Sequence, residues 1–339
     1  MRHIVAAVVN LLRLQAAGFE GLAFVIGPLL AGWHPDAAEF GALWLVGVLI
    51  NGYIFALNDL VDLARDRLNP AKARSPLVTG ALSERFALLL AVLLPLAAMA
   101  VDVAAGWSRT GLLSFAGMAA LGAFVNVYQK LTGHPIVMDG LFAVTMAAPI
   151  PVSTAGVGLK AGPLVWIVTA AMLFLSWELN SIAGNCKDLR SDQQTGFRTV
   201  AVSLGADVRS DGTLRPGRRY AAFCWSVHVP ATGLALLAVL LATAGAAVGL
   251  RLAVGLGAVL LAAWGTLDLR RLLAGRRPPS RRGRERYFAA GGLLLLVAVA
   301  ARADVVWFVT AMAVLAAWEV TFVAYWSWYW AMPASAANR

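Results

Sequence analysis

The chain has 339 residues, of which 60% are hydrophobic and only 14% are charged. A mean hydropathy of +0.73 excludes an ordinary soluble domain and indicates a protein that crosses a membrane several times. The formal net charge of +10 is concentrated in basic loops at 65–85, 187–219 and 270–286, which separate apolar segments, so nucleic-acid binding is not expected.

Membrane-spanning helices are predicted wherever an apolar run reaches about 20 residues. In chain order these runs cover 14–32, 40–58, 86–105, 110–128, 136–156, 163–184, 219–243, 247–268, 287–301 and 305–330. The expected fold class is therefore all-α, a polytopic membrane helical bundle of about nine or ten transmembrane helices. The even-numbered spans end in the basic loops, which places these loops and the N-terminus on the cytoplasmic side of a bacterial-type cell membrane.

Two acidic motifs follow the second and the sixth of these spans. The first motif contains Asp59, Asp62 and Asp66, and the second contains Asn185, Asp188 and Asp192. Spacings of three and four residues put the members of a motif on one face of a helix, where bare carboxylates repel one another. A divalent cation removes this repulsion, and hard oxygen ligands combined with substrate phosphate oxygens suit Mg²⁺. The pair of motifs predicts a cytoplasmic site for a diphosphate bound through magnesium, with a solvated helix end as the alternative for either motif alone.

The equivalent positions of the two motifs indicate an internal repeat. We expect one integral-membrane domain over residues 1–339, with the first motif in a first half of about 1–135. The second half, about 136–301, carries the second motif, and 302–339 add a further C-terminal helix. Functional sites in repeated membrane bundles commonly lie where the repeats meet.

The residues around both motifs resemble the UbiA superfamily of intramembrane prenyltransferases. Residues 58–66, NDLVDLARD, are similar to the signature NDxxDxxxD, and residues 187–199, KDLRSDQQTGFRT, are similar to the signature KDxxxDxxxGxRT. Residues 74–80, RSPLVTG, resemble the basic loop of that family, and Tyr128 with Lys130 resembles a looser tyrosine-lysine motif. The resemblance extends from the second span to Gly205.

Two positions depart from the family pattern. Ser75 interrupts the usual Arg-Pro pair of the basic loop, and Asn185 stands where the second motif often has Asp. The amide oxygen of Asn185 could bind a metal without offsetting its charge, or Asn185 could only cap or pack the end of its span. The C-terminal end beyond Arg302 is also longer than the common nine-span form.

The resemblance implies roles for individual residues. Those expected to bind metal and to act in catalysis are Asp59, Asp62, Asp66, Asp188 and Asp192. Those expected to bind the substrate are Asn58, Lys72, Arg74, Tyr128, Lys130, Asn185, Lys187 and Arg198. The expected cofactor is Mg²⁺, a Lewis acid on the diphosphate, while basic side chains stabilise the charge of the leaving group.

The expected reaction is Mg-dependent transfer of a prenyl group from a prenyl diphosphate to a lipophilic acceptor, with an aromatic acceptor favoured. The expected partners are these substrates and the membrane lipids, without an obligate protein partner. A terpene cyclase on the same scaffold, or a non-catalytic carrier or transporter of polyprenyl phosphates, stays open as an alternative. Glu20, Glu178 and Asp139 lie in apolar spans, and each could contact the acceptor or pair with polar neighbours. Acceptor identity, donor chain length and oligomeric state do not follow from the sequence.

Overall fold

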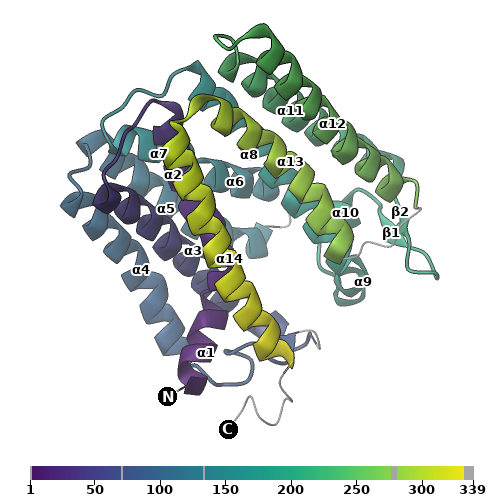
Figure 1. Cartoon of the computed structure of the whole chain (residues 1–339). Helices are drawn as coiled ribbons and strands as arrows, with labels where there is room; N and C mark the ends of the chain where they lie inside the picture. Colours follow the sequence, from purple (N-terminus) through teal and green to yellow (C-terminus); the bar gives the residue numbers. More distant parts are fainter. Residues whose placement is uncertain (1, 70–71, 133, 276–280, 332–339) are drawn as a thin grey trace. The chain divides into compact units, whose positions relative to one another are not determined.

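The computed structural model describes residues 2–69, 72–132, 134–275 and 281–331 (Figure 1). Within these ranges the chain is helical almost throughout, and the only strands are β1 (Asp207–Val208) and β2 (Leu214–Arg215). They form one antiparallel hairpin in which Asp207 lies opposite Arg215. The prediction of an all-α fold is confirmed.

Eight helical segments of the described chain are long and apolar enough to cross a membrane. They are Ala37–Asp66, Glu84–Ala104, Arg109–Tyr128, Pro135–Gly156, Pro163–Gln194, Arg218–Ala242, Val248–Leu273 and Val305–Phe322. A ninth span results if the pair Ile4–Leu11 and Leu14–Leu30, which meet at 46°, is one broken helix. A shorter apolar helix, Ala289–Arg302, corresponds to the run predicted at 287–301. The architecture is therefore that of a multi-pass membrane protein.

The helices form two compact units. The first unit contains α1 (Arg2–Leu11), α2 (Leu14–Leu30), α3 (Ala37–Asp66), α4 (Glu84–Ala104), α5 (Arg109–Thr132, except its last residue), α7 (Pro149–Gly156) and α14 (Val305–Ala331). The second unit contains α6 (Pro135–Ala147), α8 (Pro163–Glu178), a π-helix (Leu179–Gly184), α9 (Asn185–Thr195), α10 (Val200–Ser203), the hairpin, α11 (Arg218–Ala242), α12 (Val248–Leu273) and α13 (Arg281–Arg302). The predicted division into halves, about 1–135 and 136–301, remains a prediction.

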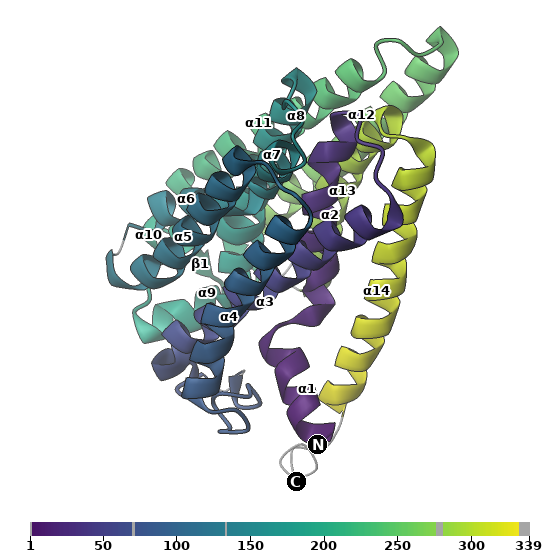
Figure 2. The ribbon, with the colours of Figure 1, turned by 90° about the vertical axis from the view of Figure 1, so that its left-hand side faces the viewer.

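In the first unit, α3 packs against α2 and α4, and α2 also packs against α7 and α14. Both ribbon views show α14 running beside α2 (Figures 1 and 2). The indole N–H of Trp318 donates to the carbonyl oxygen of Leu14 at 2.6 Å, and the ring of Trp307 stacks on Phe40 at 5.4 Å. Because lipid tails are as apolar as the helices themselves, such close contacts and hydrogen bonds are what join helices inside a bilayer.

The long helix α3 begins at a capping box. Asp36 Oδ1 accepts hydrogen bonds from the backbone N–H groups of Ala38 and Glu39, both at 2.8 Å. The Glu39 side chain in turn accepts from the Asp36 N–H at 2.9 Å. These bonds satisfy N–H groups that a helix start leaves unpaired, so the helix begins here and runs for 30 residues to Asp66.

In the second unit, α8 packs against α6 and α11, and α13 packs against α11 and α12. The π-helix joins α8 and α9 without a break in the helical chain. A hydrophobic core of the second unit includes Ile182, Leu189, Tyr220 and Leu269, all fully buried. The second acidic motif therefore continues directly from a helix whose position is fixed by packing.

Candidate active site

The first acidic motif occupies the last turns of α3. Asp59, Asp62 and Asp66 are buried, with exposed fractions of 5%, 6% and 3%. Their spacing stacks them along one face of the helix, as the sequence predicts. The C-terminal end of a helix carries partial negative charge, so buried carboxylates here are unfavourable unless cations neutralise them.

Each carboxylate of the first motif contacts a basic side chain. The contacts are Asp59 Oδ1 to Arg13 Nη2 at 2.8 Å, Asp62 Oδ2 to Arg65 Nη2 at 3.0 Å, and Asp66 Oδ2 to Lys72 Nζ at 3.2 Å. The three basic side chains remain 29–37% exposed. An arriving anion could therefore reach cations that already neutralise the acids.

Arg13 contacts the first motif, and the sequence pattern did not reveal this contact. It lies at the break between α1 and α2 with a φ of 46°, in the left-handed region that residues other than glycine rarely adopt. Asn51 donates from Nδ2 to the carbonyl oxygen of Leu12 at 2.8 Å, and the Arg13 guanidinium lies 4.3 Å from the centre of the Phe55 ring. These contacts, together with the bond to Asp59, fix the guanidinium at the first motif. Its sequence signal was a basic residue before an apolar run, which alone indicates only topology.

The other predicted residues of the first unit vary in exposure. Asn58 and Arg74 are half-buried. Tyr128 is 44% exposed, and its ring stacks on Phe124 with centroids 4.8 Å apart. The side chain of Lys130 lies outside the described residues. Their predicted roles in substrate binding remain predictions.

The second acidic motif lies on α9 and is more exposed than the first. Lys187 Nζ lies 3.2 Å from Asp188 Oδ2, and about half of each side chain is exposed, 47% and 51%. Asp192 is half-buried, and Arg198, in the segment after α9, is exposed. This part of the motif can therefore be reached by a ligand without any rearrangement of the core.

The backbone conformation at the end of α9 explains the glycine of the second motif. Gly196 ends α9 with a φ of 71°, and the N–H of Phe197 donates to the carbonyl oxygen of Asp192 at 2.8 Å. A left-handed residue at this position closes the last helical turn, and glycine adopts it without a steric penalty. The turn carries the chain from the acidic residues to Arg198.

Asn185 uses its amide within the protein. Its Nδ2 donates to the carbonyl oxygen of Asn180 at 2.8 Å, and its Oδ1 accepts from the N–H of Ala201 at 3.2 Å. The residue is 9% exposed. Asn185 thus joins the π-helix to α10, and its predicted role in binding substrate or metal remains a prediction.

A model of the UbiA prenyltransferase family matches residues 22–283, a range that includes both acidic motifs and more than half of the chain. The chain belongs to the UbiA prenyltransferase family. Like other UbiA proteins it is an integral, multi-pass membrane protein, and its helix α14 lies beyond the matched range. No curated protein sequence matches the chain.

Several solved structures share this fold at low sequence identity. A UbiA homologue from Archaeoglobus fulgidus bound to DMAPP and Mg²⁺ has a TM-score of 0.64 and 18% identity, covering 91% of this chain and 99% of its own. A UbiA homologue from Aeropyrum pernix K1 has a TM-score of 0.63 and 19% identity, covering 82% and 94%. A structure of digeranylgeranylglyceryl phosphate synthase has a TM-score of 0.61 and 14% identity, covering 92% and 100%.

The donor set of this UbiA protein fits magnesium that is bound together with a phosphate ligand. Among the described residues, no three His, Cys, Asp or Glu side chains are grouped closely enough to hold a metal ion by themselves. Mg²⁺ commonly takes only one or two carboxylates and completes its shell with water and substrate phosphates. The carboxylates on α3 and α9 are hard ligands of this kind, and thiolate ligands, which Mg²⁺ disfavours, are not needed.

Proposed function

We propose that this UbiA protein transfers a prenyl group from a prenyl diphosphate to a lipophilic acceptor within the membrane, in a reaction that requires Mg²⁺. An aromatic compound is the expected acceptor. The observation that carries the proposal is the set of three buried carboxylates at the end of α3, each in contact with a basic side chain. The homologue described as bound to DMAPP and Mg²⁺ supports the choice of ligand.

The acidic side chains of each motif would bind magnesium. Asp59, Asp62 and Asp66 would do so on the first motif, and Asp188 and Asp192 on the second. When bound, Mg²⁺ neutralises diphosphate charge and makes the group leave more easily. A solvated helix end would not require three acids that are nearly inaccessible to water.

The basic side chains would have two successive partners. In the free protein, Arg13, Arg65 and Lys72 neutralise the first motif at distances of 2.8–3.2 Å. In the loaded site, the same cations would donate to phosphate oxygens and stabilise the negative charge of the departing diphosphate. Lys187 and Arg198, which are exposed beside the second motif, would do the same there.

The apolar spans would protect the reacting carbon. An allylic cation reacts readily with water, so the prenyl chain must lie in dry surroundings until the acceptor attacks. The turns of α3 before the first motif are apolar, with Ile54, Phe55 and Leu57 half-buried. By the positive-inside rule, the basic loops after each motif would lie on the cytoplasmic side, together with the diphosphate end of the substrate.

The test uses purified protein in lipid with prenyl diphosphates and a panel of lipophilic acceptors. Chelation by EDTA should abolish diphosphate release, and added Mg²⁺ should restore it. Asp62→Asn and Asp188→Asn should each lower the rate by about 100-fold or more while the protein stays folded. Asp211→Asn, in the exposed hairpin turn, is the matched control and should keep the wild-type rate.

Three outcomes would contradict the proposal. Full turnover in EDTA, or wild-type rates in both motif variants, would show that the two motifs do not bind a catalytic magnesium ion. A cyclic product from the donor alone, identified by mass spectrometry, would indicate a terpene cyclase. Movement of a polyprenyl phosphate across a vesicle bilayer without diphosphate release would indicate a carrier.

A further inference from the structure

The second acidic motif is reached through an irregular stretch of helix. The π-helix Leu179–Gly184 stands between α8 and α9 and so directly precedes Asn185. A π-helical turn contains one residue more than an α-helical turn, and each α-helical residue accounts for about 100° of rotation. If the segment were a regular α-helix, Asp188 and Asp192 would point about 100° away from their present direction.

Side chains bind backbone carbonyl groups within the π-helix. The hydroxyl of Tyr220, on α11, donates to the carbonyl oxygen of Ser181 at 3.0 Å. The amide of Asn185 donates to the carbonyl oxygen of Asn180 at 2.8 Å. Tyr220 is fully buried, and its hydroxyl also lies 3.2 Å from the Cys186 sulfur. Insertion of a side-chain donor into the helical hydrogen-bond pattern is a recognised cause of a helix irregularity, and here it stabilises the π-helix.

The Ser181 side chain ties the same turn to α6. Its hydroxyl donates to Asp139 Oδ2 at 2.6 Å, and the exposed fractions of Ser181 and Asp139 are 0% and 3%. Ser181 is therefore bound from both sides, through its carbonyl by Tyr220 and through its hydroxyl by Asp139.

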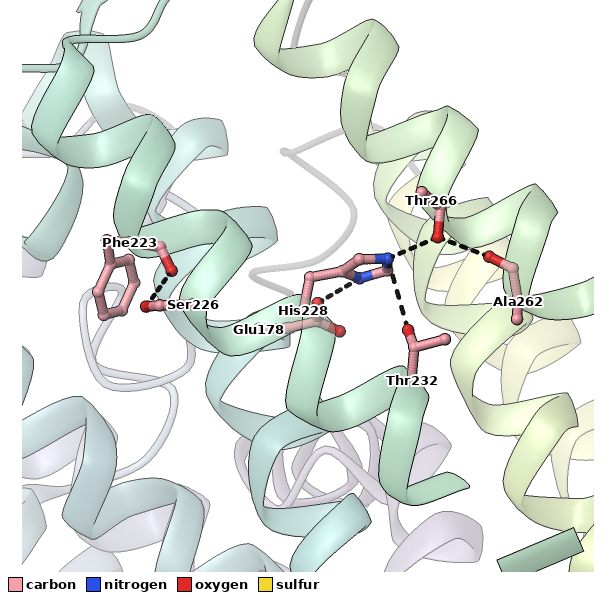
Figure 3. A network of polar contacts seen from close by, with 7 residues as sticks. All are labelled: Glu178, Phe223, Ser226, His228, Thr232, Ala262 and Thr266. Carbon is pink, nitrogen blue, oxygen red and sulfur yellow. Dashed lines mark hydrogen bonds and ion pairs between the residues drawn. The ribbon is translucent and has the colours of Figure 1, made fainter. Parts of the chain in front are cut away.

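A second polar network begins one residue before the π-helix. Figure 3 shows His228 of α11 between Glu178, Thr232 and Thr266. His228 Nδ1 lies 2.7 Å from Glu178 Oε1, and its Nε2 lies 3.0 Å from Thr266 Oγ1. Thr266 donates its own hydroxyl proton to the Ala262 carbonyl oxygen, so Nε2 must be the donor towards Thr266. The network therefore links α8 to α11 and α12.

The cavity beside this network is too small for a substrate. It is lined by side chains of α8, α11, α12 and α13, including Leu175, Thr232 and Leu294, and has a volume of about 20 Å³. That volume corresponds to about one water molecule. The Glu178–His228 pair therefore serves to join α8 to α11 and α12, just ahead of the π-helix.

We infer that the π-helix sets the helical register of the second acidic motif, and with it the direction in which the acidic side chains point. Asp139 and Tyr220 bind it directly, and the Glu178–His228 pair anchors the turn before it, so all four are positioning residues. They set the direction in which the side chains of Asp188 and Asp192 point. The inference rests on the proposed function of these two carboxylates.

The test compares variants that break one bond to the π-helix with variants that keep it. Asp139→Leu removes the acceptor of the Ser181 hydroxyl, whereas Asp139→Asn keeps an acceptor of the same size. Tyr220→Phe removes the donor to the Ser181 carbonyl. Ser226→Ala, which removes a hydroxyl from an exposed position of the same helix α11, is the control (Figure 3).

The measurements are the Mg²⁺ midpoint, kcat, and KM for a prenyl diphosphate, with hydrogen–deuterium exchange of residues 185–195 as an independent readout. Asp139→Leu and Tyr220→Phe should raise the Mg²⁺ midpoint about tenfold and speed exchange, because partners behind metal ligands affect affinity by about 10–100-fold. Asp139→Asn and Ser226→Ala should resemble the wild type.

Two results would overturn the inference while leaving the proposed function intact. One is a wild-type Mg²⁺ midpoint and exchange rate in both Asp139→Leu and Tyr220→Phe. The other is equal loss in Asp139→Asn and Asp139→Leu, which would assign the effect to the carboxylate charge. A wild-type protein without Mg²⁺-dependent turnover would overturn the proposed function itself, and the inference with it.

Discussion

Replacing Arg13 by Gln removes the guanidinium that contacts Asp59 and lies over the Phe55 ring. Two unit charges about 4 Å apart attract by about 4 kcal/mol at the effective dielectric constant near a protein surface. Desolvation and ordering of the arginine side chain reduce this value, and fully exposed pairs retain only about 0.2–1 kcal/mol. The Asp59 side chain is 6% exposed and that of Arg13 is 29% exposed, so we expect a coupling of about 2 kcal/mol between the two charges.

The coupling is measured with a double-mutant cycle of Arg13→Gln and Asp59→Asn. The free energy of unfolding of the four proteins is determined in detergent micelles by tryptophan fluorescence. Arg13→Gln alone should cost about 3 kcal/mol, since the cation–π contact adds about 1 kcal/mol to the loss of the pair. The pair Arg67–Glu84, at 3.0 Å but with 55% and 61% exposed side chains, is the control cycle and should give about 0.5 kcal/mol or less.

The same cycle tests the link between the ion pair and the substrate. With Mg²⁺ and a prenyl diphosphate present, the coupling between Arg13 and Asp59 should fall below about 1 kcal/mol, because the ligands supply other charges to both. A coupling near zero without ligands would refute the ion pair itself. A coupling of about 2 kcal/mol that ligands leave unchanged would refute the assignment of Asp59 to the diphosphate site.

Three further predictions concern stability, and the free energy of unfolding measures each. Gly27→Ala should cost about 3 kcal/mol because a backbone carbonyl of α7 occupies the space of the new methyl group. Gly41→Ala, in open space on α3, is the control and should stabilise the protein by up to about 1 kcal/mol. Equal effects of the two substitutions would contradict the packing of α2 on α7. Glu178→Leu should cost about 3 kcal/mol by removing the carboxylate partner of His228, and the double variant with His228→Leu should recover most of it; strictly additive losses would count against the pair. Asp36→Ala should cost about 1 kcal/mol through loss of the capping box, and an unchanged stability would show that α3 does not depend on this cap.

The spans and the spacing of the acids could be read from the sequence because both are local properties. An apolar run of sufficient length must form a helix in lipid, since no water is available for its backbone groups. Residues three and four apart then share a helix face whatever the helix packs against, which is why Asp59, Asp62 and Asp66 could be grouped in advance. The family motifs add the identity of the residues at these positions.

The partners of the acids required the tertiary structure. Arg13 precedes Asp59 by 46 residues, and His228 follows Glu178 by 50, so no local pattern joins them. Glu178 could be recognised in the sequence as an acid within a span, but its partner could not be chosen among the polar residues of the other helices. Asp139 likewise gained its partner, Ser181, only when α6 and the π-helix came together.

What the sequence by itself determined is therefore the membrane class, the helices and the faces that bear the acidic residues. The tertiary structure alone decided that Arg13 pairs with Asp59, that Asn185 binds Asn180 and Ala201, and that a π-helix directly precedes the second motif. The physical reason is that hydropathy and helical spacing act over a few residues of one chain segment. Ion pairs and helix irregularities instead depend on which side chains of distant segments come into contact. The residue types of one segment do not determine these contacts.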